Sequence, residues 1–355
     1  MKDRKSSIKI YFYHTQNVRH ILKEWRKGKF PAHFLYGATE MKANGIDVVW
    51  HFQNKDYPRW RVMLITAWRL LFIQRHIDAV FATHYKGLEI IVLLRALHLY
   101  CHPIIVWHHQ PIVTSKSFLR EKFGQIFYKG FDRLVFFSQD LINESLHSKK
   151  ADGDKIILGH WGADLTFYNR LLNEDTENGR FISTGKELRD MPTLLSAFNG
   201  EKEGLDIYIS RNCGGVNYAN IFDNSVVSDN ISIHYISKLS IFELSQQVAR
   251  ASCVVICCKE TRYTVGLTTL VEALALGKPV ICSRNTHWPI DVDEEGCGIS
   301  IPYYDVEGWR RAIRFIADNP DKAYEMGRCG RRLAERMYNN RQCGKEIADV
   351  IKSLI

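Results

Sequence analysis

The sequence predicts an α/β protein made of two tandem, doubly wound parallel-sheet domains. The first observation is length: 355 residues exceed what one ordinary hydrophobic core organises. The second is that short apolar runs, typical of buried strands, alternate with longer amphipathic stretches. The third is that this alternation restarts after the polar stretch 171–179. Alternating strands and helices favour a parallel, right-handed sheet covered by helices on both faces.

In the first half, five apolar β-branched or aromatic runs predict strands at 8–13, 46–51, 78–83, 103–107 and 133–137. Helical periodicity between them predicts helices at 33–44, 61–75, 87–99 and 117–128. Gly45 is a suitable C-cap for the first of these helices.

In the second half, strands are expected at 180–184, 205–210, 231–235, 253–257, 279–283 and 298–301. Helices are expected at 191–199, 240–251, 266–276 and 306–317, and a charged helical tail from Pro320 onward. We therefore predict an N-terminal domain at 1–168 and a C-terminal domain at 178–337. A last helix, about 338–355, is expected to pack back on the first domain.

The charge of the chain is divided unevenly between its two halves. Residues 1–170 contain 26 Lys and Arg against 14 Asp and Glu, a net charge of +12, whereas the remainder carries −3. Twelve of the fourteen histidines also lie in the first half. This basic half is expected to meet something anionic: nucleic acid, an acidic membrane surface or a phosphorylated substrate.

The sequence shows few of the motifs that indicate a cellular compartment or a bound cofactor. No secretory signal follows the start, and the longest apolar run, 62–73, is interrupted by Arg69 and too short to span a bilayer. Cys253, Cys257 and Cys258 read as small apolar residues of a buried strand in a reducing cytosol. Neither G-x-G-x-x-G nor G-x-x-x-x-G-K-[ST] is present, which argues against NAD chemistry and NTP hydrolysis.

Five segments of the second half carry a more specific signal. In order they are KIILGHWGADLTFYN (155–169), RFISTGKELRDMPTLLSAF (180–198), LSIFELSQQVARASCVVICC (239–258), GLTTLVEALALGKPVICS (266–283) and GCGISIPYYDVEGWRRAIRFIADNP (296–320). Together they resemble glycosyltransferase family 4 of the GT-B superfamily, whose members are retaining, nucleotide-sugar-dependent enzymes. The resemblance covers roughly 130–340, and the first 130 residues match in element order only. It implies two Rossmann-like domains facing a cleft.

The resemblance implies that the helix at 266–276 binds the donor. Its N-terminal amides would face the donor diphosphate, as the helix dipole favours. Glu272 would accept hydrogen bonds from the ribose hydroxyls, and it is counted with the catalytic residues; the alternative is an exposed helix face. Where the family usually has a second acid, this chain has Thr264. Thr264 and Gly185 are counted with the donor-binding positions, together with Gly266, Leu267 and Thr268 at the start of the helix.

The resemblance also implies how the diphosphate charge is balanced. The family usually works without a metal and uses basic residues in the first loop of the donor domain, which here match Lys186 and Arg189 after Gly185. Both could instead be solvated loop charges. We expect no cofactor and no metal site; the stretch DVDEE (291–295) is interpreted as a surface turn.

Two strand-end loops of the basic half supply a catalytic candidate, His109, and several acceptor-binding candidates. In PIIVWHHQP (103–111), His109 is the better match to a histidine that the family often places near the transferred sugar, and His108 is second. A neutral imidazole can hydrogen-bond a sugar hydroxyl or move a proton. A structural histidine at a strand end is the alternative. His84 and Lys86, in FATHYKG (81–87), are further acceptor-binding candidates.

Basic and aromatic residues alternate at 21–30, 58–75 and 116–130, which suits the interface of an anionic membrane. An amphipathic core helix remains the alternative for 58–75, and a solvated loop for 21–30. We expect a cytoplasmic protein, peripheral at the inner face of the cell membrane.

The sequence thus favours a retaining, metal-independent, hexosyltransferase-like glycosyltransferase. It would move a sugar from a nucleotide-diphosphate donor to a glycan or polyprenyl-linked acceptor in surface polysaccharide or lipopolysaccharide synthesis. A nucleotide-sugar 2-epimerase of the same architecture is an alternative. A basic nucleic-acid-binding protein would explain the +12 half but not the donor-domain motifs, and no recognised nucleic-acid module appears.

Overall fold

The computed structural model describes residues 7–52, 57–172, 174 and 179–355. The first six residues, used for the secretory-signal expectation, and most of the linker expected at 171–179 lie outside this description. The chain separates into two compact units, each described here by itself. Unit 1 comprises 1–27, 32–161 and 340–355, and unit 2 comprises 28–31 and 162–339.

Unit 1 is built on a six-stranded sheet with the order β2-β1-β3-β4-β5-β6, in which all neighbouring strands pair in parallel. Its strands are β1 (Ile8–Tyr13), β2 (Ile46–Trp50), β3 (Ala79–Ala82), β4 (Ile104–His108), β5 (Arg133–Phe136) and β6 (Ile156–Leu158). Its helices are α1 (Val18–Arg26), α2 (Arg59–Trp68), α3 (Glu89–Ala96), α4 (Phe118–Tyr128), α5 (Gln139–His147) and α13 (Asn340–Lys352). A π-helical turn, Arg69–Ile73, continues α2.

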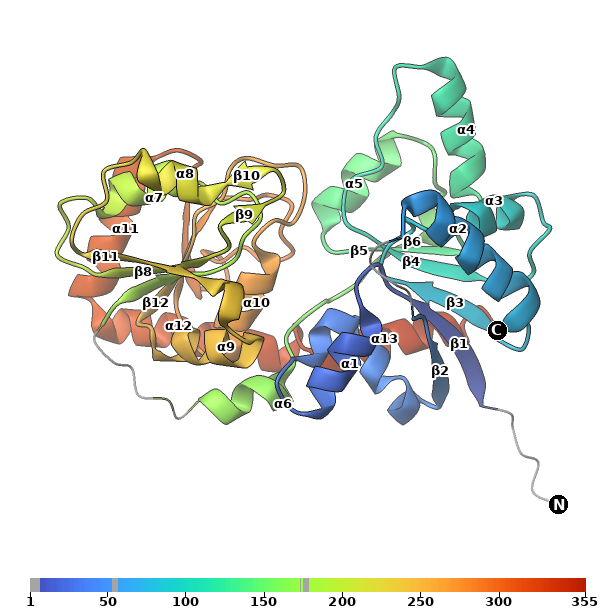
Figure 1. The fold of residues 1–355 in the computed structure, drawn as a ribbon, viewed down its shortest axis with the longest axis horizontal. Coiled ribbons are helices and arrows are strands. Elements are labelled where there is room, and N and C mark those ends of the chain that lie inside the picture. Colours follow the sequence, from blue (N-terminus) through green and yellow to red (C-terminus); the bar gives the residue numbers. More distant parts are fainter. Residues whose placement is uncertain (1–6, 53–56, 173, 175–178) are drawn as a thin grey trace. The chain divides into compact units, whose positions relative to one another are not determined.

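Unit 2 repeats this architecture with the strand order β11-β8-β7-β12-β13-β14, again all parallel (Figure 1). Its strands are β7 (Phe181–Ser183), β8 (Leu205–Ile209), β11 (Ile231–Tyr235), β12 (Cys253–Ile256), β13 (Val280–Ser283) and β14 (Gly298–Ile301). Its helices are α6 (Leu165–Tyr168), α7 (Met191–Phe198), α8 (Tyr218–Asp223), α9 (Ile241–Arg250), α10 (Leu267–Ala275), α11 (Val306–Asp318) and α12 (Pro320–Arg336). A small hairpin pairs β9 (Asn212–Cys213) with β10 (Val216–Asn217).

The two parallel sheets confirm the predicted fold class, and each predicted strand is present within two residues of its expected bounds. The helix predicted at 33–44 is wrong. That stretch forms three short 3-10 turns, Ala32–Leu35, Ala38–Glu40 and Lys42–Asn44. Tyr36 and Gly37 both have positive φ, 51° and 77°, which an α-helix does not accommodate. Helices α1 and α5 are present where no helix was predicted.

Each sheet has a topological switch point, where successive strands begin to be added on the opposite side. In unit 1 it lies between β1 and β3, and in unit 2 between β7 and β12. Ligands of open α/β sheets bind beyond the carboxyl ends of the strands at such points, because the loops there diverge and leave space. We therefore expect a ligand-binding site at the loops that follow β1, β3, β7 and β12.

Helix α13 belongs to unit 1 although it follows unit 2 in the sequence. Figure 1 shows this helix, in red, among the blue elements from the start of the chain. It approaches the turn at Gly37 backbone to backbone: a Cβ on Gly344 would lie 2.4 Å from Glu40 Cβ and 2.9 Å from Gly37 O. The Glu346 carboxylate also accepts hydrogen bonds from the backbone N–H of His160 (2.9 Å) and from its ring nitrogen Nδ1 (2.8 Å). Glycine at positions 37 and 344 permits the close approach of these two backbone segments.

Among the described residues, no helix combines the length and apolar character that crossing a membrane requires. All nine cysteines are free, and six of them are buried. Cys253, Cys257 and Cys258 line the buried strand β12 and the residues that follow it, as the sequence predicts.

Candidate active site

The loop between β7 and α7 begins the site of unit 2, at the switch point of its sheet. Gly185 follows the strand with φ 97°, and a Cβ there would lie 2.0 Å from the NH2 nitrogen of Arg189. A larger residue would strain the backbone and displace that guanidinium. Glycine therefore lets the loop turn tightly over a charged side chain.

The Arg189 side chain is 3% exposed and fixed by internal acceptors. Its Nε donates to Thr184 O (3.0 Å), NH1 to Glu187 O (3.1 Å) and to Cys258 Sγ (3.1 Å), and NH2 to Thr269 Oγ1 (3.1 Å). These bonds join the loop after β7 to the end of β12 and the first turn of α10. Arg189 thus places a fixed positive charge beneath the loop, whereas Lys186 in the same loop is exposed.

Helix α10 starts at the same switch point. Its N-cap is Gly266, with φ 91°, and a Cβ there would lie 2.8 Å from both Ile256 Cγ2 and Trp288 Cζ2. The preceding loop is anchored by Trp288 Nε1, which donates to Val265 O at 2.8 Å. In the first turn Leu267 is buried and Thr268 exposed, and Thr264 before it is half-buried. The turn therefore presents backbone amides and one threonine hydroxyl beside the Arg189 charge.

Glu272 lies further along α10 and is 8% exposed, so the alternative of an exposed helix face is wrong. Its Oε1 accepts a 2.6 Å hydrogen bond from the Ser245 hydroxyl on α9 and a 3.4 Å bond from the Tyr168 hydroxyl on α6. Burial raises the pKa of the carboxyl to about 7, and the two hydrogen bonds oppose that rise. Both bonds end on Oε1, so a further hydroxyl group would be accepted at Oε2.

The histidines of unit 1 predicted as catalytic or acceptor-binding residues gather at the ends of β3 and β4. His84 and His109 stack with ring centroids 5.7 Å apart and planes 17° apart. His109 Nε2 lies 2.8 Å from Thr83 O, so Nε2 carries the hydrogen and donates it. Burial, together with the neighbouring His109, lowers the pKa of His84 to about 3. His84 Nδ1 accepts from the backbone N–H of Lys86 at 3.0 Å, so this ring is neutral and ordered.

His108 differs from its neighbour because its ring is buried, 6% exposed, and both nitrogens are bonded within unit 1. Nδ1 lies 2.6 Å from Gln110 O, and Nε2 lies 3.0 Å from Tyr128 Oη. Burial lowers the pKa of His108 to about 4, which keeps the ring neutral. An acceptor would have to displace one of these bonds, so the geometry favours His109 over His108. The Lys86 side chain is exposed.

Sequence reasoning did not single out several residues in the two regions just described. His51 follows β2 directly, and the strand-end rule that selected His84 would also have selected it. Tyr168 is an aromatic shortly after W-G-x-D, but no pattern indicates its hydrogen bond to Glu272. Ser245 lies on a helix of ordinary amphipathic periodicity, which carries no signal for a contact with α10.

Among the residues that the structure describes, no cluster of three or more His, Cys, Asp or Glu side chains could hold a metal ion. In the DVDEE stretch, Asp291 accepts from the backbone amides of Asp293 and Glu294, at 3.0 and 3.2 Å. Asp293 in turn accepts from Ser300 N at 3.1 Å. These contacts agree with the interpretation of this stretch as a turn.

Comparison with known proteins gives one sequence match and many fold matches. No family model matches the chain. A D-inositol 3-phosphate glycosyltransferase of Saccharomonospora viridis is 37% identical over 71 residues, which are 20% of this chain and 16% of that protein. The match thus spans well under two thirds of that relative.

Solved structures match over nearly the whole chain. Sucrose-phosphate synthase from Thermosynechococcus elongatus superposes with a TM-score of 0.71 at 14% identity, covering 98% of this chain and 99% of that one. HepE of Anabaena, solved with UDP-glucose, gives 0.67 at 12% identity, covering 98% and 100%. WaaG, described as a glycosyltransferase of lipopolysaccharide biosynthesis, gives 0.63 at 12% identity, covering 97% and 99%. The chain therefore has the GT-B fold, which confirms the resemblance at the level of the fold.

Proposed function

We propose that the protein is a glycosyltransferase that binds a nucleotide-diphosphate sugar in unit 2. The observation that carries the proposal is the arrangement at the switch point of that unit. We assign the diphosphate to the start of α10, beside the fixed Arg189 charge, and the ribose to the buried Glu272 further along the same helix. The complex of HepE with UDP-glucose supports a nucleotide-sugar donor for this fold.

In this proposal each group has a distinct task. The amides of the first turn of α10, with Thr268, bind phosphate oxygens, and the exposed Lys186 adds a positive charge. Glu272 Oε2 accepts a ribose hydroxyl while Ser245 and Tyr168 hold Oε1 in place. Thr264, where related enzymes usually carry an acid, offers a neutral hydroxyl to the sugar. Two cationic side chains and a helix N-terminus offset the charge of the diphosphate, so we propose that no metal is needed.

We propose that transfer retains the anomeric configuration. The acceptor hydroxyl oxygen forms a bond to the anomeric carbon on the face from which the diphosphate leaves. The bond between that carbon and the diphosphate oxygen breaks, and the departing diphosphate takes the acceptor proton. We assign recognition of a sugar hydroxyl on the acceptor side to His109, whose ring is oriented by the bond from Nε2 to Thr83 O.

The surface of α2 supports a membrane-associated acceptor. The helix buries Val62 and Thr66 against unit 1, yet its opposite side exposes large apolar side chains. Those are Trp60 (62% exposed), Leu64 (54%), Trp68 (59%) and, in the π-turn, Phe72 (51%). They recur every fourth residue and so form one stripe. The alternative of a plain core helix does not explain this stripe.

Positive charges accompany the apolar stripe. Arg59, Arg61 and Arg75 lie on or next to the helix. On α4 the exposed Phe118, Leu119 and Phe123 are likewise interleaved with basic residues. Aromatic side chains with surrounding cations suit the headgroup region of an anionic bilayer. We therefore propose a peripheral protein at the cytoplasmic face of the membrane, which extends a glycan or polyprenyl-linked acceptor for a surface polysaccharide or lipopolysaccharide.

A thermal-shift screen of UDP, GDP, ADP and CDP, each with its common sugar conjugates, tests the donor assignment. A nucleotide at about 100 times its dissociation constant should stabilise the protein by roughly 2.7 kcal/mol. The matching sugar conjugate should then release free nucleotide when the acceptor is present, and proton NMR of the product reports retention or inversion. Absence of stabilisation by every nucleotide would contradict the proposed function.

A further inference from the structure

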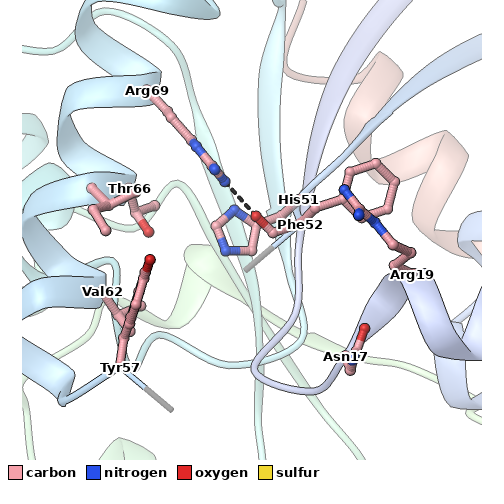
Figure 2. A pocket seen from close by; sticks show the side chains of 9 residues that line it. Asn17, Arg19, His51, Phe52, Tyr57, Val62, Thr66 and Arg69 are labelled. Atoms are coloured by element: carbon pink, nitrogen blue, oxygen red, sulfur yellow. Dashed lines mark hydrogen bonds between the residues drawn. The ribbon is translucent and has the colours of Figure 1, made fainter. Parts of the chain in front are cut away.

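Unit 1 contains a pocket that the donor site and the acceptor histidines do not explain. Its volume is about 320 Å³, and it lies beyond the carboxyl ends of β1 and β2, against one side of α2 (Figure 2). It opens beside the switch point of the unit 1 sheet, where ligands of such sheets bind. Its described lining residues are Asn17, Arg19, His51, Phe52, Tyr57, Val62, Ile65, Thr66 and Arg69.

Two arginines make this pocket cationic. Arg69 reaches in from the end of α2 and donates from NH1 to Phe52 O at 2.5 Å. Arg19, on α1, holds its guanidinium carbon 5.1 Å from the centroid of the Phe52 ring. Figure 2 shows the two guanidinium groups reaching toward Phe52 from α1 and from α2. None of the described lining residues is acidic, so the charge of the arginines is not balanced from within this lining.

A buried hydroxyl in the wall of the pocket lacks a partner. Thr66 is 0% exposed, and its Oγ1 makes no hydrogen bond, although a helical threonine often bonds a carbonyl one turn earlier. Figure 2 shows this hydroxyl on the same side of the pocket as the hydroxyl of Tyr57. An unsatisfied buried polar group costs stability, so its presence in a cavity wall points to a ligand atom that completes it.

The floor of the pocket contains a hydrogen-bonded pair of side chains, Tyr11 and His51. The Tyr11 hydroxyl lies 2.5 Å from His51 Nδ1. Burial raises the pKa of Tyr11 to about 12, against the opposing charge of Arg69, so the Tyr11 hydroxyl stays neutral and adds no negative charge to the pocket. The pocket thus combines donors and positive charge without a described acidic group.

We propose that this pocket binds a phosphoryl group of the acceptor substrate through Arg19, Arg69 and the Thr66 hydroxyl. The inference rests on the proposed function, because it takes unit 1 as the acceptor-binding unit. A tetrahedral dianion uses several convergent donors and the planar fork of arginine, whereas a neutral sugar would leave the two charges unbalanced. The group could belong to a soluble sugar phosphate or to the diphosphate of a lipid-linked acceptor, since the recognised chemistry is the same.

The test is a binding titration of the full-length protein at low ionic strength with saturating UDP present. The probes are inorganic phosphate, glucose 6-phosphate as a soluble sugar phosphate, and farnesyl diphosphate as a short prenyl diphosphate, each followed by ³¹P NMR. Arg19→Gln should weaken the bound probe at least about tenfold, because one charge-assisted hydrogen bond is lost. Lys23→Gln, on the same helix but outside the pocket lining, is the matched control and should leave binding unchanged.

Thr66→Val separates a binding role from a structural one. It removes the unpartnered hydroxyl with little change of shape, so the protein should be at least as stable while probe binding weakens. The preferred probe identifies the source: glucose 6-phosphate indicates a soluble acceptor, and farnesyl diphosphate a lipid-linked one.

Three results would overturn the inference: no probe binds, both variants bind like the wild type, or phosphate competes with UDP and so occupies the donor site. Parallel UDP titrations without phosphate distinguish a failure of the proposed function from a failure of the phosphoryl-site inference. If UDP binds but no phosphate probe does, the proposed function stands and only this inference falls. If UDP fails to bind, the donor assignment falls, and the phosphate titration without UDP remains interpretable.

Discussion

Replacing Glu272 by glutamine should change nucleotide binding and stability in opposite directions, and both changes should depend on pH. In the folded protein the pKa of this carboxyl is raised from 4.5 to about 7 by burial. The carboxylate is the form that accepts hydrogen bonds from ribose. Glutamine preserves the shape of the side chain but neither titrates nor carries charge, so it isolates the contribution of the carboxylate.

The sign for stability follows from the raised pKa. The folded state holds the proton more tightly than the unfolded state, so the stabilisation is complete below about pH 4.5 and is lost as the pH rises through 7. The shift corresponds to about 3 kcal/mol at 1.36 kcal/mol per pKa unit. Wild-type stability should therefore fall relative to Glu272→Gln between pH 5 and pH 8, by up to about 3 kcal/mol.

Nucleotide binding should change the other way. At pH 8 the substitution removes a hydrogen bond to a charged acceptor, worth about 1.5–3 kcal/mol, or roughly 10- to 150-fold in affinity. Below pH 7 the wild type must first release its proton, so its affinity should weaken about tenfold per pH unit. By pH 5 the two proteins should bind the nucleotide almost equally.

Calorimetric titration of UDP, or of the nucleoside diphosphate that the screen selects, into both proteins at pH 5, 6, 7 and 8 measures the affinity ratio. Urea unfolding at the same pH values measures the stability difference. Titration of the nucleotide phosphates affects both proteins alike and cancels in the ratio. An affinity ratio that stays constant from pH 5 to pH 8, with both proteins folded, would refute the role of Glu272 in ribose binding.

Three further predictions concern the loop, the membrane and the fold. Activity should persist in EDTA, and strict dependence on magnesium would count against this account. Lys186→Ala should raise KM for the donor without unfolding the protein. Arg189→Ala should raise KM and also lower Tm, because the Arg189 guanidinium joins three segments of the chain. Trp60→Ser combined with Trp68→Ser should weaken sedimentation with anionic vesicles by about tenfold or more while UDP binding is kept, since burying one large apolar side chain contributes roughly 1.5–3 kcal/mol; equal sedimentation of both proteins across a salt series would exclude α2 as the membrane contact. Gly344→Ala should destabilise the protein by about 1–3 kcal/mol, because its Cβ would meet Glu40 and Gly37, and an unchanged urea midpoint would show that this contact relaxes freely.

Sequence periodicity predicted eleven of the strands because buried parallel strands are short, continuous apolar runs with clear ends. It failed at 33–44, where Tyr36 and Gly37 reverse the sign of φ within an otherwise helical pattern. It also missed α1, whose basic and aromatic residues were interpreted as a possible membrane segment. Composition does not distinguish these cases, because the deciding information is the backbone conformation of one or two residues.

The donor elements were predictable because the segment around Glu272 combines a helix start, a glycine turn and a strand in one continuous stretch. The partners of Glu272 were not, since Tyr168 and Ser245 come from helices distant in sequence. The unit 1 pocket was missed for a similar reason. Arg19 and Arg69 become neighbours only because β2 lies beside β1 in the sheet, a strand order that local patterns do not specify.

The grouping of α13 with unit 1 has a consequence for synthesis of the chain. Residues 340–352 leave the ribosome after the whole stretch 162–339, so most of unit 2 is available to fold before unit 1 has received its last helix. Until then, the backbone surface at Gly37 and the ring of His160 lack the contacts that Gly344 and Glu346 supply. While synthesis continues, the nascent chain exposes surfaces that are not yet fully assembled. Such surfaces promote aggregation, and chaperones protect them. An early stop codon before residue 340 would thus impair the unit at the start of the chain, whose other segments are all intact.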